Sequence, residues 1–173
     1  MNEILEILKY VLPSLVVFAA TYYLIKLFLD NEQKKRIADI KMAGYKIITP
    51  IRLQAYERLI LLLERISPES LIMRIHKQEF SALQLQTALI STIREEFEHN
   101  LSQQVYVSSQ AWELIKSAKE DIIKLINTAS TQLNDNATSM ELCQKIFELS
   151  LSQDKLLYKS ALEFLKNEIR HVF

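Results

Sequence analysis

Residues 10–29, YVLPSLVVFAATYYLIKLFL, form an apolar run in which Lys26 is the only charged residue. Twenty residues of α-helix, at about 1.5 Å per residue, extend about 30 Å, which is the thickness of the hydrocarbon core of a bilayer. We therefore expect one transmembrane helix near the start of the chain. Residues 30–173 remain for a function beside the membrane.

The run is expected to be retained as an anchor rather than cleaved as a signal peptide. A signal peptide begins with basic residues and ends in a small-residue cleavage site. Residues 1–9, MNEILEILK, instead carry two Glu and one Lys, and the small residues Ala19 and Ala20 lie inside the run.

The flanks of the run indicate how it is oriented. Basic residues follow it, whereas only Lys9 precedes it. The positive-inside rule then places residues 1–9 outside and the long C-terminal part in the cytoplasm. Aromatic and basic side chains favour the interface between lipid and water. The candidate interface residues are Tyr10, Tyr22, Tyr23, Lys26, Lys34, Lys35 and Arg36.

Composition favours an all-α fold and excludes several functions. One Gly and three Pro in 173 residues leave little turn chemistry for β-hairpins. Acidic and basic residues number 21 each, so no net field attracts nucleic acid. The single cysteine, Cys143, forms neither an intramolecular disulfide nor a multi-cysteine metal site, and we interpret it as a core residue.

Helical periodicity divides the chain after the run. We expect a charged helical linker over residues 30–48 and a cytoplasmic bundle over residues 49–173, with about four long helices and one short helix. The predicted helices cover residues 50–66, 71–76, 81–104, 109–133 and 139–173, the last with a bend near residues 150–152. Their predicted N-caps are Thr49, Ser67, Ser81, Ser108 and Thr138.

The helix predicted over residues 81–104 carries polar residues on its apolar stripe. The stripe contains Leu83, Leu89, Ile90, Ile93, Phe97 and Leu101. Gln104 lies on the centre line of this stripe, and Asn100 lies about 40° from that line. Since a buried amide needs hydrogen-bond partners, this end of the helix is expected to hold a polar network or a bound group.

Two E-x-x-H patterns, Glu96 with His99 and Glu168 with His171, invite comparison with di-iron carboxylate bundles. Such ligands project inward, but Glu96 lies about 80° and His99 about 140° from the centre of the apolar stripe. We therefore predict no metal site. We also predict no cofactor, because the sequence has no Gly-rich phosphate loop, no G-x-S-x-G and no Cys–His arrangement.

Three segments together resemble a known family: residues 53–66 (LQAYERLILLLERI), 94–108 (REEFEHNLSQQVYVS) and 111–120 (AWELIKSAKE). With the single N-terminal run, they resemble an uncharacterised family of small membrane proteins found mainly in the Bacteroidota. The resemblance implies a single-pass protein of a bacterial inner membrane and implies no catalytic residues.

The expected function is therefore that of a non-enzymatic, membrane-anchored accessory subunit or scaffold, with a protein partner or a second copy. Two surfaces are candidates for contact: the segment 100–106 with Trp112, and a charged ridge at positions 57, 58, 64 and 65. The alternative is a membrane-bound enzyme or sensor with a ligand or metal around residues 95–104. The candidate contact residues are Glu57, Arg58, Glu95, Glu98, His99, Asn100, Gln103, Gln104, Tyr106 and Trp112.

Overall fold

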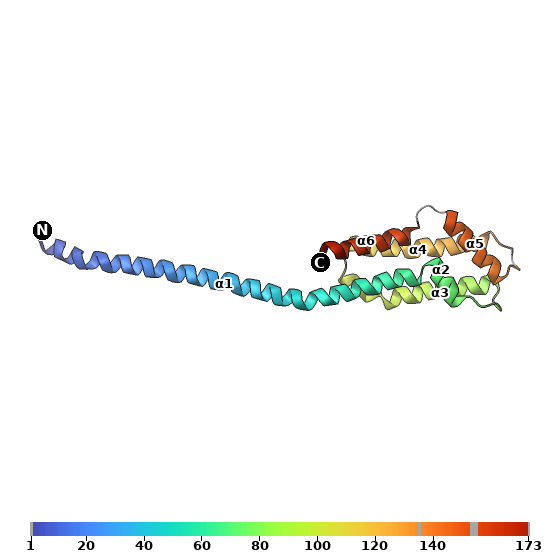
Figure 1. Cartoon of the computed structure of the whole chain (residues 1–173), viewed down its shortest axis with the longest axis horizontal. Coiled ribbons are helices and arrows are strands. Elements are labelled where there is room, and N and C mark those ends of the chain that lie inside the picture. The colour runs from blue at the N-terminus through green and yellow to red at the C-terminus, as the bar shows by residue number, and fades with distance from the viewer. Residues whose placement is uncertain (1, 135, 153–155, 173) are drawn as a thin grey trace. The chain divides into compact units, whose positions relative to one another are not determined.

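The structure is a computed structural model that describes residues 2–134, 136–152 and 156–172, with the backbone alone for residues 2–8 and 171–172. Its helices are α1 (Asn2–Arg65), α2 (Pro68–Ile75), α3 (Ala82–His99), the short 3₁₀ helix η1 (Leu101–Val105), α4 (Ser109–Thr131), α5 (Ser139–Ser152) and α6 (Leu157–Val172) (Figure 1). The described residues form no strand, and the one isolated bridge pairs Ser81 with Thr138. The all-α prediction is confirmed.

The chain divides into two compact units, Met1–Thr49 and Pro50–Phe173. The helix start predicted at Thr49 and Pro50 is wrong, because α1 is continuous through both residues. Proline within a helix removes one hydrogen bond, here the bond to the Lys46 carbonyl, and the turns on either side keep theirs.

The first unit is a helix whose apolar side chains are uncovered. Among the described residues, α1 is the one helix long and apolar enough to cross a membrane, and none of its most apolar stretch is buried. The second unit, in contrast, closes a core of its own.

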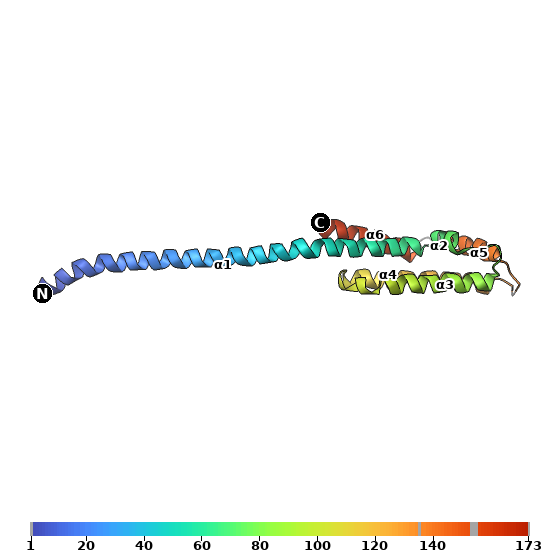
Figure 2. The ribbon, with the colours of Figure 1, turned by 90° about the horizontal axis from the view of Figure 1, so that it is seen from below.

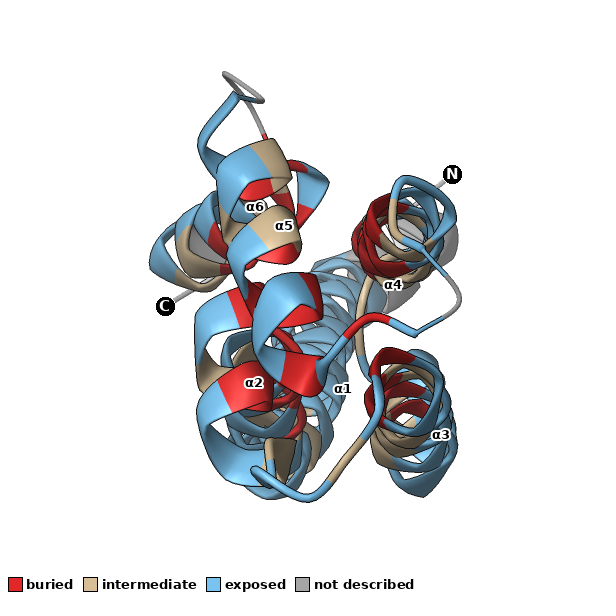
Figure 3. Cartoon of the chain, turned by 90° about the vertical axis from the view of Figure 1, so that its right-hand side faces the viewer, coloured by how far each residue is buried: buried red, intermediate tan, exposed pale blue. Residues whose placement is uncertain are grey.

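The core of the second unit lies between four lengthwise helices: residues 50–65 of α1 together with α3, α4 and α6 (Figures 1 and 2). Seen along the bundle, their buried surfaces face one another, while α2 and α5 cover one end (Figure 3). The largest fully buried side chains are Tyr56, Leu59, Leu62, Leu63, Ile66, Leu71, Leu85, Leu89, Ile93, Ile115, Ile122 and Ile126.

Side-chain caps fix where the helices of this unit begin. The Ser67 hydroxyl accepts from the Ser70 N–H at the start of α2. Ser81 and Gln84 form a reciprocal capping box at the start of α3. Ser108 caps α4. These caps satisfy N–H groups that have no partner in the first turn of a helix, as predicted.

The helix predicted over residues 81–104 is shorter, because α3 ends at His99 and a 3₁₀ turn follows. The Asn100 N–H bonds the Phe97 carbonyl three residues back, which tightens the chain. Two predicted stripe residues, Leu83 and Leu101, are in fact exposed. Leu83 lies about 160° around the helix from the fully buried Leu85.

Two further helical predictions need correction. Leu53, placed on the apolar face of the helix predicted over residues 50–66, is exposed. The element predicted over residues 139–173 is two helices, α5 and α6, and the first ends at Ser152, where a bend was expected.

The cap of α5 makes the stability of the second unit depend on pH. The Glu141 carboxylate accepts from the Thr138 N–H at 2.7 Å and from the Thr138 hydroxyl at 2.9 Å. These bonds hold the pKa of that carboxyl below its usual 4.5. A carboxyl with a lowered pKa in the folded state contributes stability above its unfolded pKa, and the contribution is lost as the pH falls through the folded pKa.

We predict that acid destabilises the wild type more than Glu141→Gln, whose amide accepts the same bonds without titrating. The free energy of unfolding would be measured in urea between about pH 6 and about pH 2 through the emission of Trp112. Glu148→Gln, an exposed change in the same helix, serves as the control and should keep the wild-type slope. Equal slopes for wild type and Glu141→Gln would contradict the assigned cap.

Candidate functional site

The predicted contact segment, residues 100–106, consists of η1 and its two flanking residues and lies largely at the surface. Gln104 and Tyr106 are exposed and Gln103 is half-buried, so the predicted buried amide network is wrong for Gln104. The prediction assumed that the α-helical period continues, whereas the 3₁₀ turn changes the direction of each side chain. Asn100 is half-buried and donates to the Glu96 carbonyl at 2.9 Å.

Trp112 belongs to the core and is not open to a partner. Its side chain is buried and stacks on Phe97, with 5.3 Å between the ring centroids. The Lys119 ammonium lies 4.4 Å from the centroid of the Phe97 ring on this cluster. Of the two roles considered for Trp112, packing and partner contact, the structure therefore supports packing.

The charged residues of the alternative ligand site lie at the surface. Glu95, Glu98 and His99 are exposed, and Glu95 accepts a hydrogen bond from Ser91 at 2.9 Å. Glu57 and Arg58, from the charged ridge, are also exposed. The described residues contain no group of three or more His, Cys, Asp or Glu side chains placed to hold a metal, and the His171 side chain lies outside them.

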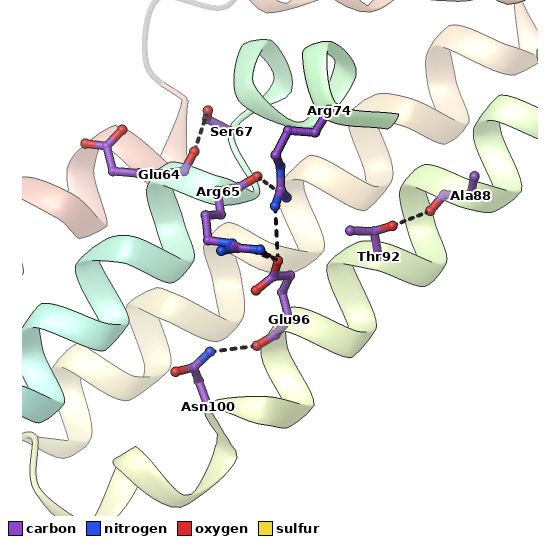
Figure 4. Close-up of polar contacts among 8 residues, drawn as sticks. All are labelled: Glu64, Arg65, Ser67, Arg74, Ala88, Thr92, Glu96 and Asn100. Carbon is purple, nitrogen blue, oxygen red and sulfur yellow. Dashed lines mark hydrogen bonds and ion pairs between the residues drawn. The ribbon is translucent and has the colours of Figure 1, made fainter. Parts of the chain in front are cut away.

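A polar cluster that the sequence did not predict joins α1, α2 and α3 (Figure 4). Glu96, on α3, accepts from Arg65 at 2.6 Å and 2.8 Å and from Arg74 at 3.3 Å. Arg74, on α2, also donates to the Arg65 carbonyl at the end of α1, at 3.1 Å. This last bond satisfies a carbonyl that the helix itself leaves free.

The cluster assigns Glu96 to structure rather than to ligand binding. One carboxylate compensates two guanidinium groups and is itself only 17% exposed. Because its oxygen is already shared between two cations, Glu96 has little capacity left for a metal. The contacts instead fix the turn between α1 and α2 against α3.

Beside this turn, α1, α2 and α6 surround an open depression of about 560 Å³, which we call the α1–α2–α6 groove. Its lining residues are Leu61, Glu64, Arg65, Ser67, Glu69, Ser70, Met73 and Tyr158. Met73 is 84% exposed and Leu61 is 55% exposed, so two large apolar side chains stand in water here. Exposed apolar surface rimmed by polar groups is typical of protein contact sites.

Two carboxylates give the groove its charge. The buried Tyr158 hydroxyl donates to Glu69 at 3.4 Å. Burial, together with the charges of Glu69 and Glu64, raises the pKa of Tyr158 to about 12. Neither carboxylate has an ion-pair partner among the described residues, whereas Arg65 is paired with Glu96. The uncompensated charge of the groove is therefore negative.

A second unpredicted polar contact lies between α1 and α6. The fully buried Tyr56 hydroxyl lies near Arg52 and Glu168 but forms no hydrogen bond of good geometry with the described residues. Burial and the Glu168 charge raise the pKa of Tyr56, and Arg52 partly opposes them. Arg52 also donates to the Tyr106 carbonyl at 3.1 Å, which ties α1 to η1.

Comparison with known proteins supplies a family. A family model described as "Family of unknown function (DUF7935)" matches residues 2–172. The chain belongs to this family. Since the match extends from α1 to α6, the DUF7935 family comprises the apolar helix and the bundle together. No curated protein and no solved structure gave a match.

In this DUF7935 chain, one feature of the sequence indicates the groove. Leu61 and Met73 are apolar residues at positions that the helical period assigns to the polar face. The pairing of Arg65 with Glu96 had no such signal, because these residues are 31 positions apart in sequence and meet only through the register between α1 and α3.

We predict that Glu96→Gln lowers the free energy of unfolding of the full chain by about 1 kcal/mol, because two partly exposed guanidinium groups lose their counter-charge. Glu98→Gln removes an exposed charge from the same helix and should leave stability unchanged within about 0.5 kcal/mol. Urea titration followed by far-UV circular dichroism measures both. The same loss in the two variants would contradict the bridging role of Glu96.

Proposed function

We propose that this protein is a single-pass inner-membrane protein of the Bacteroidota whose C-terminal bundle is a cytoplasmic docking module. The observation that carries the proposal is that residues 10–29 are exposed, while the core of the bundle contains none of them. It supports a protein with one part for the membrane and one part for a partner.

The exposed surface is too costly to leave in water. Eleven Val, Leu, Ile and Phe side chains between positions 11 and 29 are exposed. Burying them is worth more than about 15 kcal/mol in total. A whole domain is stable by only about 5–15 kcal/mol. A bilayer covers such a helix completely, and it also accepts the polar backbone of a helix, whose hydrogen bonds are internal.

The charges beside the span support one orientation. Lys34, Lys35 and Arg36 follow the apolar run after the four residues 30–33, and a cytoplasmic position for them agrees with the positive-inside rule. Tyr10 at one end, and Tyr22, Tyr23 and Lys26 towards the other, suit the two interfaces of the bilayer.

The α1–α2–α6 groove is the docking surface that we propose for the partner. Its exposed Leu61 and Met73 offer apolar contact, and Glu64 and Glu69 offer negative charge that no described cation pairs, since Arg65 of the lining is paired with Glu96. These features suit a partner helix or loop with apolar residues flanked by Lys or Arg. The protein would thus act as a non-enzymatic accessory subunit or scaffold.

We predict opposite labelling of two cysteine variants on a Cys143→Ala background. Asn2→Cys should react with a membrane-impermeant maleimide in cells with a permeabilised outer membrane, and Glu57→Cys should react only after lysis. Reaction of both positions before lysis would argue against a span between them. Reaction of Glu57→Cys alone would reverse the proposed orientation.

The docking role predicts a loss of partner recovery in Met73→Lys. This change places a charge in the groove at a position that is already exposed, so the bundle should stay folded. Met140→Lys, at an exposed methionine outside the groove, is the matched control. The tagged full chain, purified in mild detergent, should retain its partner in wild type and in Met140→Lys and lose it in Met73→Lys. Recovery of this protein alone from the wild type would contradict the accessory role.

A further inference from the structure

Gly44 is the only glycine in the 173 residues, and it lies in the interior of α1. Glycine is among the least favourable helix residues because it loses the most backbone freedom on folding. A glycine at such a position therefore calls for a compensating reason, usually an unusual backbone angle or the close approach of another group.

No described residue of the first unit supplies that reason. Gly44 has no positive φ, so its backbone angles suit any residue. A Cβ placed on Gly44 would meet nothing within 4 Å. The glycine thus leaves open space on the outside of the helix.

The open space lies within an apolar stripe of the first unit. Ile40, Gly44 and Ile48 follow one another at intervals of four residues, and Ile37 and Ile47 lie within about 60° of Gly44. Lys41 borders the stripe about 60° from Gly44 on the other side. These four isoleucines are all more than half exposed, Ile40 the most at 73%. Asp39 and Lys46 lie on the opposite side of the helix. A small residue lets the backbones of two helices approach closely, and the exposed isoleucines around it offer apolar surface for that contact.

Lipid cannot cover this stripe if residues 10–29 span the bilayer, a condition that rests on the proposed function. Gly44 lies fifteen positions beyond Leu29, or about 22 Å along the continuous helix, and hence outside the hydrocarbon core. A second copy anchored by the same span has the same direction and places its own Gly44 at the same height. The stripe then meets an identical stripe, as a two-fold symmetric interface requires.

We propose that this protein forms a parallel homodimer in which the two α1 helices cross most closely at Gly44, with Ile37, Ile40, Ile47 and Ile48 packed around the crossing. The interface is separate from the α1–α2–α6 groove, which stays available to another protein.

Gly44→Leu tests the crossing. Leucine is a better helix former than glycine, so a loss of association in this variant cannot come from a loss of helix. Ala38→Leu is the matched control, because it also enlarges a small residue of the same helix but lies about 120° away from Gly44. The full chain is reconstituted in vesicles of phosphatidylethanolamine and phosphatidylglycerol, and the dimer fraction is measured by energy transfer between labelled copies.

We expect wild type and Ala38→Leu to associate alike, and Gly44→Leu to associate at least about tenfold more weakly. Single cysteines on a Cys143→Ala background provide the second readout in the same vesicles. Ile40→Cys and Ile47→Cys should form disulfide-linked dimers on oxidation, and Asp39→Cys and Lys46→Cys should not.

Three results would overturn the proposal: a wild type that is monomeric in the vesicles, equal cross-linking at all four positions, or a Gly44→Leu variant that associates as well as wild type. The vesicle experiment also keeps the two proposals distinct. A chain that fails to insert contradicts the proposed span, whereas a chain that inserts and stays monomeric contradicts the dimer alone.

Discussion

The structure depends on one constraint: the apolar side chains of residues 10–29 are not covered by any of the residues that the structure describes. In a globular protein such a helix would form the centre of the core, and the other helices would pack around it. Here the bundle of residues 50–172 closes around Tyr56, Leu85 and Ile115 and uses none of that run. The apolar surface is therefore available to an environment outside the chain, and a bilayer is the environment that fits both its length and its composition.

The bundle achieves its independence through local devices at its helix ends. At four helix starts a side-chain oxygen accepts from a backbone N–H; these residues are Ser67, Ser81, Ser108 and Thr138. At the end of α1, the Arg74 guanidinium donates to the free Arg65 carbonyl. Glu96 then fixes the corner between α1, α2 and α3 with a single carboxylate. A corner held by charge is weaker than a packed core, but it fixes direction, and it sets the position of α2 beside the groove.

Local features of the sequence predicted local features of the fold. The caps and the buried stripe of α3 follow from the identity of neighbouring residues, and four of the five predicted caps are present. The helix start predicted at Thr49 was wrong because a proline can lie inside a continuous helix. The burial predicted for Gln104 was wrong because a 3₁₀ turn changes the helical period. The Arg65–Glu96 pair and the groove were beyond prediction, since both depend on how distant helices are aligned against each other. Glu96 shows the same limit: its E-x-x-H pattern can be read from the sequence, but its partners Arg65 and Arg74 come from two other helices.

Two kinds of exposed apolar residue lie on α1. In the bundle, Leu61 is exposed beside carboxylates, where a contact can form and dissociate in water with little cost to the fold. In the first unit, Ile40 and Ile48 flank a glycine that no described residue approaches closely. A polar rim favours an exchangeable partner, whereas a small residue within an isoleucine stripe favours a close and lasting fit between two helices. Permanent self-association near the membrane and reversible docking on the bundle therefore make different physical demands, and α1 carries a surface suited to each.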